Sequence, residues 1–311
     1  MLATFVSMLC SSILTICITC LSAFAVTLIF KTSTTTNFAQ GSIATLGCYV
    51  TAELFKRFGF PVYLGIIPGV VVGILLGLFV DVVIFRNGRS VNPVGKQIIT
   101  MGLVSIIFGG IPLIFGNPES IPFEPFYNAV AVGESPNIFI PFGSSSLVVT
   151  KHSLVSLAIT IVVLGVLFSL IKFSKWGLAV RTTASSESTA ELMGINTHVI
   201  TAASWGIAGA IGVLAAVMYA GGGAKIGVSF MTTIQVNAFL AGILGGFSTF
   251  YGPIVGAICI QVAATCVGFL AAFPGMSGIT RWNMVIVYAL MLLVILIKPQ
   301  GLMGKPIVKK V

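Results

Sequence analysis

Long apolar stretches alternate with short polar breaks along the whole chain. A helix needs about 20 apolar residues to cross a bilayer, so each long stretch predicts one membrane span. The first stretch carries no charge, but it is long and lacks a basic segment before it, so we interpret it as a retained span and not as a signal peptide. The predicted spans are Thr4–Phe30, Pro61–Val80, Gln97–Phe115, Ser153–Ile171, Val199–Ala220, Thr233–Phe247, Pro253–Ala272 and Trp282–Ile297.

A further segment, Thr32–Ala52, is polar at its start and uncharged throughout. Its hydroxyl and amide groups between Thr32 and Asn37 can satisfy backbone groups where a regular helix is broken. The segment either crosses the membrane or dips in and returns. The pattern therefore predicts an all-α, polytopic membrane protein with eight or nine transmembrane helices, and the two counts put the N-terminus on opposite sides.

Composition leads to the same class. The chain has 311 residues, of which 57% are hydrophobic and 7% charged, so a soluble fold would expose more apolar surface than water tolerates. We expect a single transmembrane domain over residues 1–311, surrounded by lipid. The formal charge of +9 comes from bases scattered among the loops without a continuous stripe, which argues against nucleic-acid binding.

The charged residues predict the orientation of the loops. The segment 116–152 contains Glu119, Glu124 and Glu134 with Lys151 as its only base, so we place it outside as an extracytoplasmic loop. Basic residues favour the cytoplasmic side of a membrane protein. On the nine-span count the inward-facing bases are Lys31, Arg86, Arg89, Lys96, Lys172, Lys175, Arg181, Lys298, Lys305, Lys309 and Lys310.

The stretch 172–198 is a polar interruption between two long apolar runs, and we expect it to be a cytoplasmic loop. Ser185 and Ser186 can cap a helix there, which would run over Ser188–Met193 and end at Gly194. Such a short helix on a loop between spans offers a surface for a partner protein. A solvated loop without a partner is the alternative.

Two further groups of residues have predicted roles inside the membrane. One group is a set of glycines spaced every fourth residue, which lie on one helical face and allow close helix packing: Gly65, Gly69, Gly73 and Gly77. The other group holds the candidates for a translocation pathway, because polar residues in broken segments are the best pointers to one: Asn37, Gln40, Thr45, Gln235 and Asn237. Hydrogen bonding between neighbouring helices is the structural alternative for each of them.

Catalytic and metal chemistry is not expected. All six cysteines fall in apolar runs, and the CxxC pair Cys17 and Cys20 lacks the polar setting that a redox thiolate needs. His152 and His198 lie in different segments without metal-ligand spacing, so we expect solvated or capping histidines. An intramembrane enzyme would need a constellation that these residues do not supply.

Several motifs in order resemble the permease subunit of branched-chain amino acid ABC importers. The resemblance covers the chain from about Asn37 to the tail. The motifs are NFAQG at Asn37–Gly41, ELMGIN at Glu191–Asn196, FLAGILGGFSTFYGPIVGA at Phe239–Ala257 and KPQGLMGKP at Lys298–Pro306.

In this family the cytoplasmic loop carries a coupling helix that docks into a groove of the ATPase, and its general motif is EAA, three residues, then Gly. Ala190 and Gly194 match that motif, whereas Ser188 and Thr189 stand where it has Glu and Ala. The resemblance implies that the coupling residues are Arg181, Glu187, Ala190, Glu191 and Gly194.

The resemblance also implies partners. They are two cytoplasmic ATPase subunits, a second related permease and an extracytoplasmic solute-binding protein, in a bacterial plasma (inner) membrane. The chain has no GxxxxGK[ST] motif, so ATP and Mg are expected on the ATPase and no cofactor on this chain.

Two alternative functions stay open at this point. One is an ABC permease for another small solute, such as a sugar, a nucleoside or urea. The other is an ATP-independent secondary transporter, which would need charges at mid-membrane that the sequence hardly offers.

Overall fold

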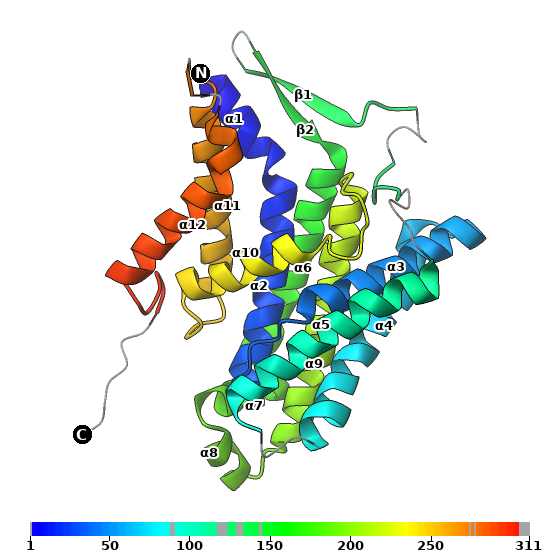
Figure 1. The fold of residues 1–311 in the computed structure, drawn as a ribbon, viewed down its shortest axis with the longest axis vertical. Helices are drawn as coiled ribbons and strands as arrows, with labels where there is room; N and C mark the ends of the chain where they lie inside the picture. The colour runs from blue at the N-terminus through cyan, green and yellow to red at the C-terminus, as the bar shows by residue number, and fades with distance from the viewer. Residues whose placement is uncertain are drawn as a thin grey trace.

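The protein is a bundle of membrane-length helices with a β-hairpin at one end, as a computed structural model shows (Figure 1). The structure describes residues 2–87, 91–116, 123–128, 133–142, 145–273, 275–276 and 278–304, so Arg89, Glu119, Lys305, Lys309 and Lys310 lie outside the described residues. The elements are α1 (Leu2–Ser11), α2 (Ile13–Ser33), α3 (Gln40–Phe58), α4 (Val62–Phe79), the π-helix η1 (Val80–Phe85), α5 (Pro93–Phe115), β1 (Asn137–Phe142), β2 (Ser145–Thr150), α6 (Lys151–Phe173), α7 (Lys175–Ser185), α8 (Glu187–Leu192), α9 (Thr197–Gly221), α10 (Thr232–Gly245), α11 (Gly252–Leu270) and α12 (Ile279–Ile297).

Within the described residues, seven helices are long and apolar enough to span a membrane, fewer than the eight or nine predicted. They are α2, α4 continued by η1, α5, α6, α9, α11 and α12. The two remaining predicted spans correspond to α3 and α10. α3 carries Glu53, Lys56 and Arg57 in its last turns, and α10 has only 14 residues. Both are too polar or too short to qualify as spans by themselves.

The predicted first span, Thr4–Phe30, is wrong as one helix, because the chain breaks between α1 and α2. The hydroxyls of Ser11 and Ser12 donate hydrogen bonds to the carbonyl oxygens of Met8 and Leu9, at 2.8 Å each. Serine hydroxyls that bond to a preceding turn in this way compete with the regular helix ladder. The spanning helix is α2, and α1 is a separate helix before it.

The expectation of an all-α fold is wrong at one place, the segment before α6. β1 and β2 pair antiparallel, from Asn137 opposite Thr150 to Phe142 opposite Ser145. The hairpin leads directly into α6, whose first residue Lys151 forms an ion pair with Glu134. The hydrogen bond from Lys151 lowers the pKa of Glu134, so this carboxylate stays ionised as a neutral-pH partner of the lysine.

α2 and α9 form the centre of the bundle. In each, 72% of the residues in the most apolar window are buried, against 11% in α12 and 17% in α5. The side chains that fill the space around them include Phe24, Tyr49 and Trp205, all fully buried. The outer helices expose apolar side chains, as expected where lipid is the solvent.

Glycines allow α4 to pack closely on α3 and α9. A Cβ at Gly73 would lie 2.8 Å from the carbonyl oxygen of Gly209 in α9, and a Cβ at Gly69 would lie 2.6 Å from that of Gly47 in α3. Distances this short leave no room for a methyl group. The face of α4 that carries Gly65, Gly69, Gly73 and Gly77 is thus the face in contact with other backbones.

Replacing Gly73 by leucine is expected to force α4 and α9 apart. Overpacking of this kind typically costs about 1–3 kcal/mol, and we expect the unfolding midpoint in detergent to fall by roughly 2 °C or more. Gly102→Leu in α5 is the matched control, because a Cβ there meets nothing within 4 Å. Equal midpoints for the two variants in a thermal-unfolding assay would contradict the packing argument.

Candidate functional site

Three of the predicted pathway residues meet where α3 and α10 begin. The Asn37 side-chain amide donates to Gln40 Oε1 at 3.2 Å, and Gln235 Nε2 donates to the Asn37 carbonyl oxygen at 3.2 Å. Gln40 Nε2 also donates to the carbonyl oxygen of Ala208 in α9, at 2.7 Å. All three side chains are buried. We call Asn37, Gln40 and Gln235 the amide network.

The local sequence explains why the network forms at this point. α2 ends at Ser33, Thr34 adopts a positive φ of 49°, and the chain stays non-helical until α3. The backbone N–H and C=O groups that this break leaves without a helical hydrogen bond need other partners. Asn37 Oδ1 accepts from the Ala39 N–H at 2.9 Å, and Thr100 of α5 accepts from the Phe38 N–H at 3.2 Å.

The helices α3 and α10 leave this region in opposite directions (Figure 1). Their first turns are close, since a Cβ at Gly41 would lie 3.1 Å from Gln235 Cβ. The broken segment, the two helix starts and three neutral amides therefore share one buried region between α3, α9 and α10.

The other two predicted pathway residues lie outside the network. Thr45 donates its hydroxyl hydrogen bond to Gly41 within its own helix, at 2.9 Å. Asn237 accepts a hydrogen bond from the hydroxyl of Tyr288 in α12, at 2.9 Å. Sequence reasoning did not single out Tyr288 or Thr100, because nothing in their local sequence identifies a partner so far along the chain.

The loop 172–198 contains two helices. α7 was not expected; it begins after Ser174, whose hydroxyl accepts from the Gly177 N–H at 2.9 Å. α8 matches the expected short helix within one residue, because the Ser186 hydroxyl accepts from the Thr189 N–H at 3.3 Å. Gly194 has a φ of 79°, which suits a glycine after the end of a helix.

α8 has one face on the protein and one in solvent. Ala190 is fully buried, and Glu191 Oε1 accepts from the Thr197 hydroxyl at the start of α9, at 2.9 Å. Leu192 is 89% exposed and Met193 70% exposed. The exposure of these two apolar side chains was not predicted, although the adjacent Leu and Met of the ELMGIN motif were a usable signal for it.

The remaining predicted coupling residues lie on the solvent side of this loop. Arg181 is exposed and donates to the backbone carbonyl oxygens of Gly177 and Lys172 at 3.4 Å. Glu187 is exposed at the first turn of α8, where a carboxylate suits the positive end of a helix.

A small polar pocket of about 110 Å³ lies behind α8, between Glu187 and η1. Asp81 of η1 is buried there and accepts from the Thr201 hydroxyl at 3.3 Å, while Arg86 donates to the His198 carbonyl oxygen at 3.3 Å. π-Helical turns within α-helices, such as η1, are frequent at functional sites. Asp81 directly follows the predicted span Pro61–Val80, but its position beside the loop was not predicted.

The expectation of a solvated or capping histidine is wrong for His152. Its ring is buried at the start of α6, with Nδ1 accepting from the Phe126 N–H at 3.2 Å. Nδ1 is therefore unprotonated, and Nε2 donates to the Met218 carbonyl oxygen at 2.9 Å. The ring joins three separate segments of the chain, which its sequence neighbours could not indicate.

Comparisons with known proteins cover nearly the whole chain. Residues 8–295 match the family model described as branched-chain amino acid transport system / permease component. The probable branched-chain amino acid transport permease protein LivH of Methanocaldococcus jannaschii is 27% identical, over 91% of this chain and 88% of that protein. The high-affinity branched-chain amino acid transport system permease protein BraD of Pseudomonas aeruginosa is also 27% identical, over 94% of this chain and 93% of that protein.

A solved structure has a similar fold. PsaBC from Streptococcus pneumoniae, in complex with Fab, aligns with a TM-score of 0.53 over 96% of this chain and 97% of that chain, at 14% identity. At this identity the likeness concerns the fold alone. The family match and the seven candidate spans together identify a multi-pass transport protein. The chain belongs to the family of permease components of branched-chain amino acid transport systems.

Proposed function

We propose that this chain is the membrane-spanning permease subunit of an ATP-driven ABC importer, and that it translocates branched-chain or related amino acids by alternating access. The observation that carries the proposal is α8. It presents Leu192 and Met193 to solvent and is tied to α9 by the bond between Thr197 and Glu191. An exposed apolar patch on a small anchored helix is suited to bind a protein groove.

A movement of α8 would reach the amide network through α9. α9 begins at Thr197, and the Ala208 carbonyl oxygen that accepts from Gln40 lies eleven residues further along. This separation is about 16 Å along a helix. Because α9 is a single continuous helix packed on α2, α3 and α4, a displacement at its first turn is transmitted to the break before α3.

The proposed orientation puts α7 and α8 in the cytoplasm. Lys31, Lys172 and Arg181 surround one pocket at that end, and Arg86 and Lys96 line the polar pocket behind α8. The hairpin with Glu134 lies at the opposite end (Figure 1). This distribution supports a cytoplasmic α8 end under the positive-inside rule.

The proposed complex holds two cytoplasmic ATPase subunits, a second related permease and an extracytoplasmic solute-binding protein in a bacterial plasma membrane. ATP and Mg are bound by the ATPase, and this chain holds no cofactor. A net-neutral amino acid fits the amide network, since amide groups can bond to polar atoms of the solute without selecting a net charge.

Purification of the tagged chain from detergent-solubilised native membranes tests the complex. We expect an ATPase and a second permease to co-purify, and the reconstituted complex with its solute-binding protein to accumulate labelled leucine only with ATP. Accumulation driven by an ion gradient without ATP would support a secondary transporter. Competition by sugars but not by leucine would change the proposed solute.

Leu192→Asp combined with Met193→Asp should weaken retention of the ATPase. Loss of buried apolar contacts at the centre of an interface commonly costs about 2 kcal/mol or more, so we expect at least a roughly tenfold loss of co-purified ATPase. Leu2→Asp is the control, because Leu2 is 68% exposed at the other end of the molecule. Equal retention by all three proteins would mean that α8 does not dock the ATPase.

Gln235→Leu distinguishes a pathway role from a structural role of the amide network. We expect leucine uptake per folded protein to fall about tenfold. A purely structural loss of one hydrogen bond, about 1 kcal/mol, would lower only the folded fraction, for which this measure already corrects. Gln261→Leu is matched, because Gln261 is also buried and donates to Thr19 at 3.1 Å between helices. If both variants lose stability alike and transport alike, Gln235 is only structural.

A further inference from the structure

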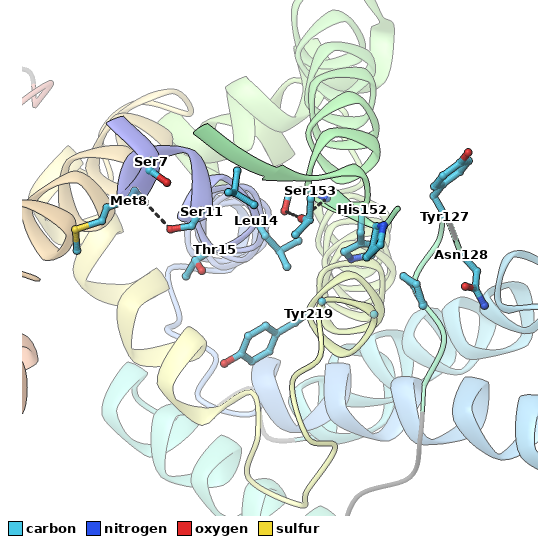
Figure 2. A pocket seen from close by; sticks show the side chains of 16 residues that line it. Ser7, Met8, Ser11, Leu14, Thr15, Tyr127, Asn128, His152, Ser153 and Tyr219 are labelled. Atoms are coloured by element: carbon cyan, nitrogen blue, oxygen red, sulfur yellow. Dashed lines mark hydrogen bonds between the residues drawn. The ribbon is translucent and has the colours of Figure 1, made fainter. Parts of the chain in front are cut away.

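A cavity of about 550 Å³ lies at the hairpin end of the molecule, on the side away from α8. Its walls come from the α1–α2 junction, the segment before the hairpin, β2, the start of α6 and the end of α9. Figure 2 shows Ser11 and Thr15 on one side and His152 and Ser153 across from them. This volume is typical of pockets for small molecules.

The lining combines hydroxyl groups with apolar side chains. Ser7, Ser11 and Thr15 lie near Met8, Leu14 and Tyr219. Among the described residues that line the cavity, none is a lysine, an arginine or a carboxylate. His152 is held neutral, because its Nδ1 accepts a backbone hydrogen bond. Such a wall favours a solute without net charge that has both polar and apolar parts.

The far wall of the cavity is fixed before any solute arrives. His152 bonds to Phe126 on one side and to Met218 on the other, and its ring stacks on that of Phe126 at 6.0 Å between centroids. A Cβ at Gly221 would lie 2.9 Å from His152 Cε1, so α9 approaches the ring closely because of this glycine. A wall fixed in this way lowers the entropic cost of binding.

The cavity and the amide network share α9. Tyr219 lines the cavity, and Ala208 accepts the hydrogen bond from Gln40 eleven residues earlier, about 16 Å along the helix. The same helix begins at Thr197, beside α8. One rigid element therefore touches the cavity, the network and the loop that would bind the ATPase.

We propose that this cavity is a receiving site that binds the net-neutral aliphatic amino acid before it reaches the amide network. This inference rests on the proposed function. Hydroxyls of Ser11 and Thr15 bond to the polar end of the amino acid, and Leu14 and Met8 contact its side chain. The site holds the solute weakly, because the polar groups that line it are uncharged.

Filling the cavity tests the proposal in the complete transport complex. Thr15→Trp places a bulky ring in the cavity, and within the described residues the Thr15 hydroxyl makes no hydrogen bond that this change would break. We expect ATP-dependent uptake of labelled leucine to fall at least tenfold, with equal amounts of membrane-inserted chain and ATPase. Thr4→Trp, at an exposed position of α1 outside the lining, should transport within twofold of the unmodified chain.

A second variant avoids any effect on folding. Thr15→Cys is folded first and then labelled with a bulky, membrane-impermeant maleimide from outside, with the identically treated unmodified chain as control for its own cysteines. We expect labelling to stop leucine uptake and millimolar L-leucine to slow the labelling of Thr15→Cys at least threefold. Protection by leucine is a binding readout that does not require transport.

The outcomes separate the two proposals. If the unmodified complex imports leucine and Thr15→Trp imports it equally well, the receiving site is wrong while the proposed function stands. If the unmodified complex imports no leucine and leucine gives no protection, the proposed function fails. If Thr15→Cys is not labelled from outside at all, the cavity does not open to that side and the receiving site is again overturned.

Discussion

The bilayer core offers no water to the backbone, so each interruption of a helix must find partners inside the protein. The break between α2 and α3 shows how this chain meets that constraint. Its N–H groups at Phe38 and Ala39 bond to Thr100 and to Asn37, and the Asn37 carbonyl oxygen bonds to Gln235. The break therefore fixes the positions of α5 and α10 relative to α3. A polar region inside an apolar bundle is the direct result.

α9 connects the parts of the molecule for which functional roles are proposed. Its glycine face lets α4 approach, its carbonyl oxygen at Ala208 binds Gln40, its last turns line the cavity, and its first residue bonds to α8. Because packed cores switch between discrete arrangements and do not deform continuously, a helix with contacts of this kind can transmit a small displacement over its full length.

Hydropathy predicted most of the spanning helices, because the length of an apolar run depends only on local composition. The short helix of the loop was also predictable, from a serine cap and a glycine stop within eight residues. The break at Ser12 was not predictable in this way, since its serines form hydrogen bonds that an apolar count ignores. The apolar count also took Thr233–Phe247 as a span, although α10 has only 14 residues, and it left Thr32–Ala52 open between a span and a re-entrant segment.

Pairings between distant segments were the other part that sequence could not supply. Asn37 and Gln235 were both selected as candidates, but their hydrogen bond joins residues 198 positions apart and could not be derived from either neighbourhood. Asn237 was selected with them and binds Tyr288 instead. His152 was expected to be solvated or to cap a helix, yet its two ring nitrogens join segments that only the tertiary fold brings together.

The neutrality of the amide network has an electrical consequence. Moving one elementary charge across a membrane potential involves about 2.3 kcal/mol per 100 mV, whereas a zwitterion that passes neutral amides carries no net charge. Transport along such a route generates no current and does not draw on the membrane voltage. Under the proposed function, the nucleotide would then supply the whole driving force, and accumulation inside the cell would be independent of how strongly the membrane is polarised.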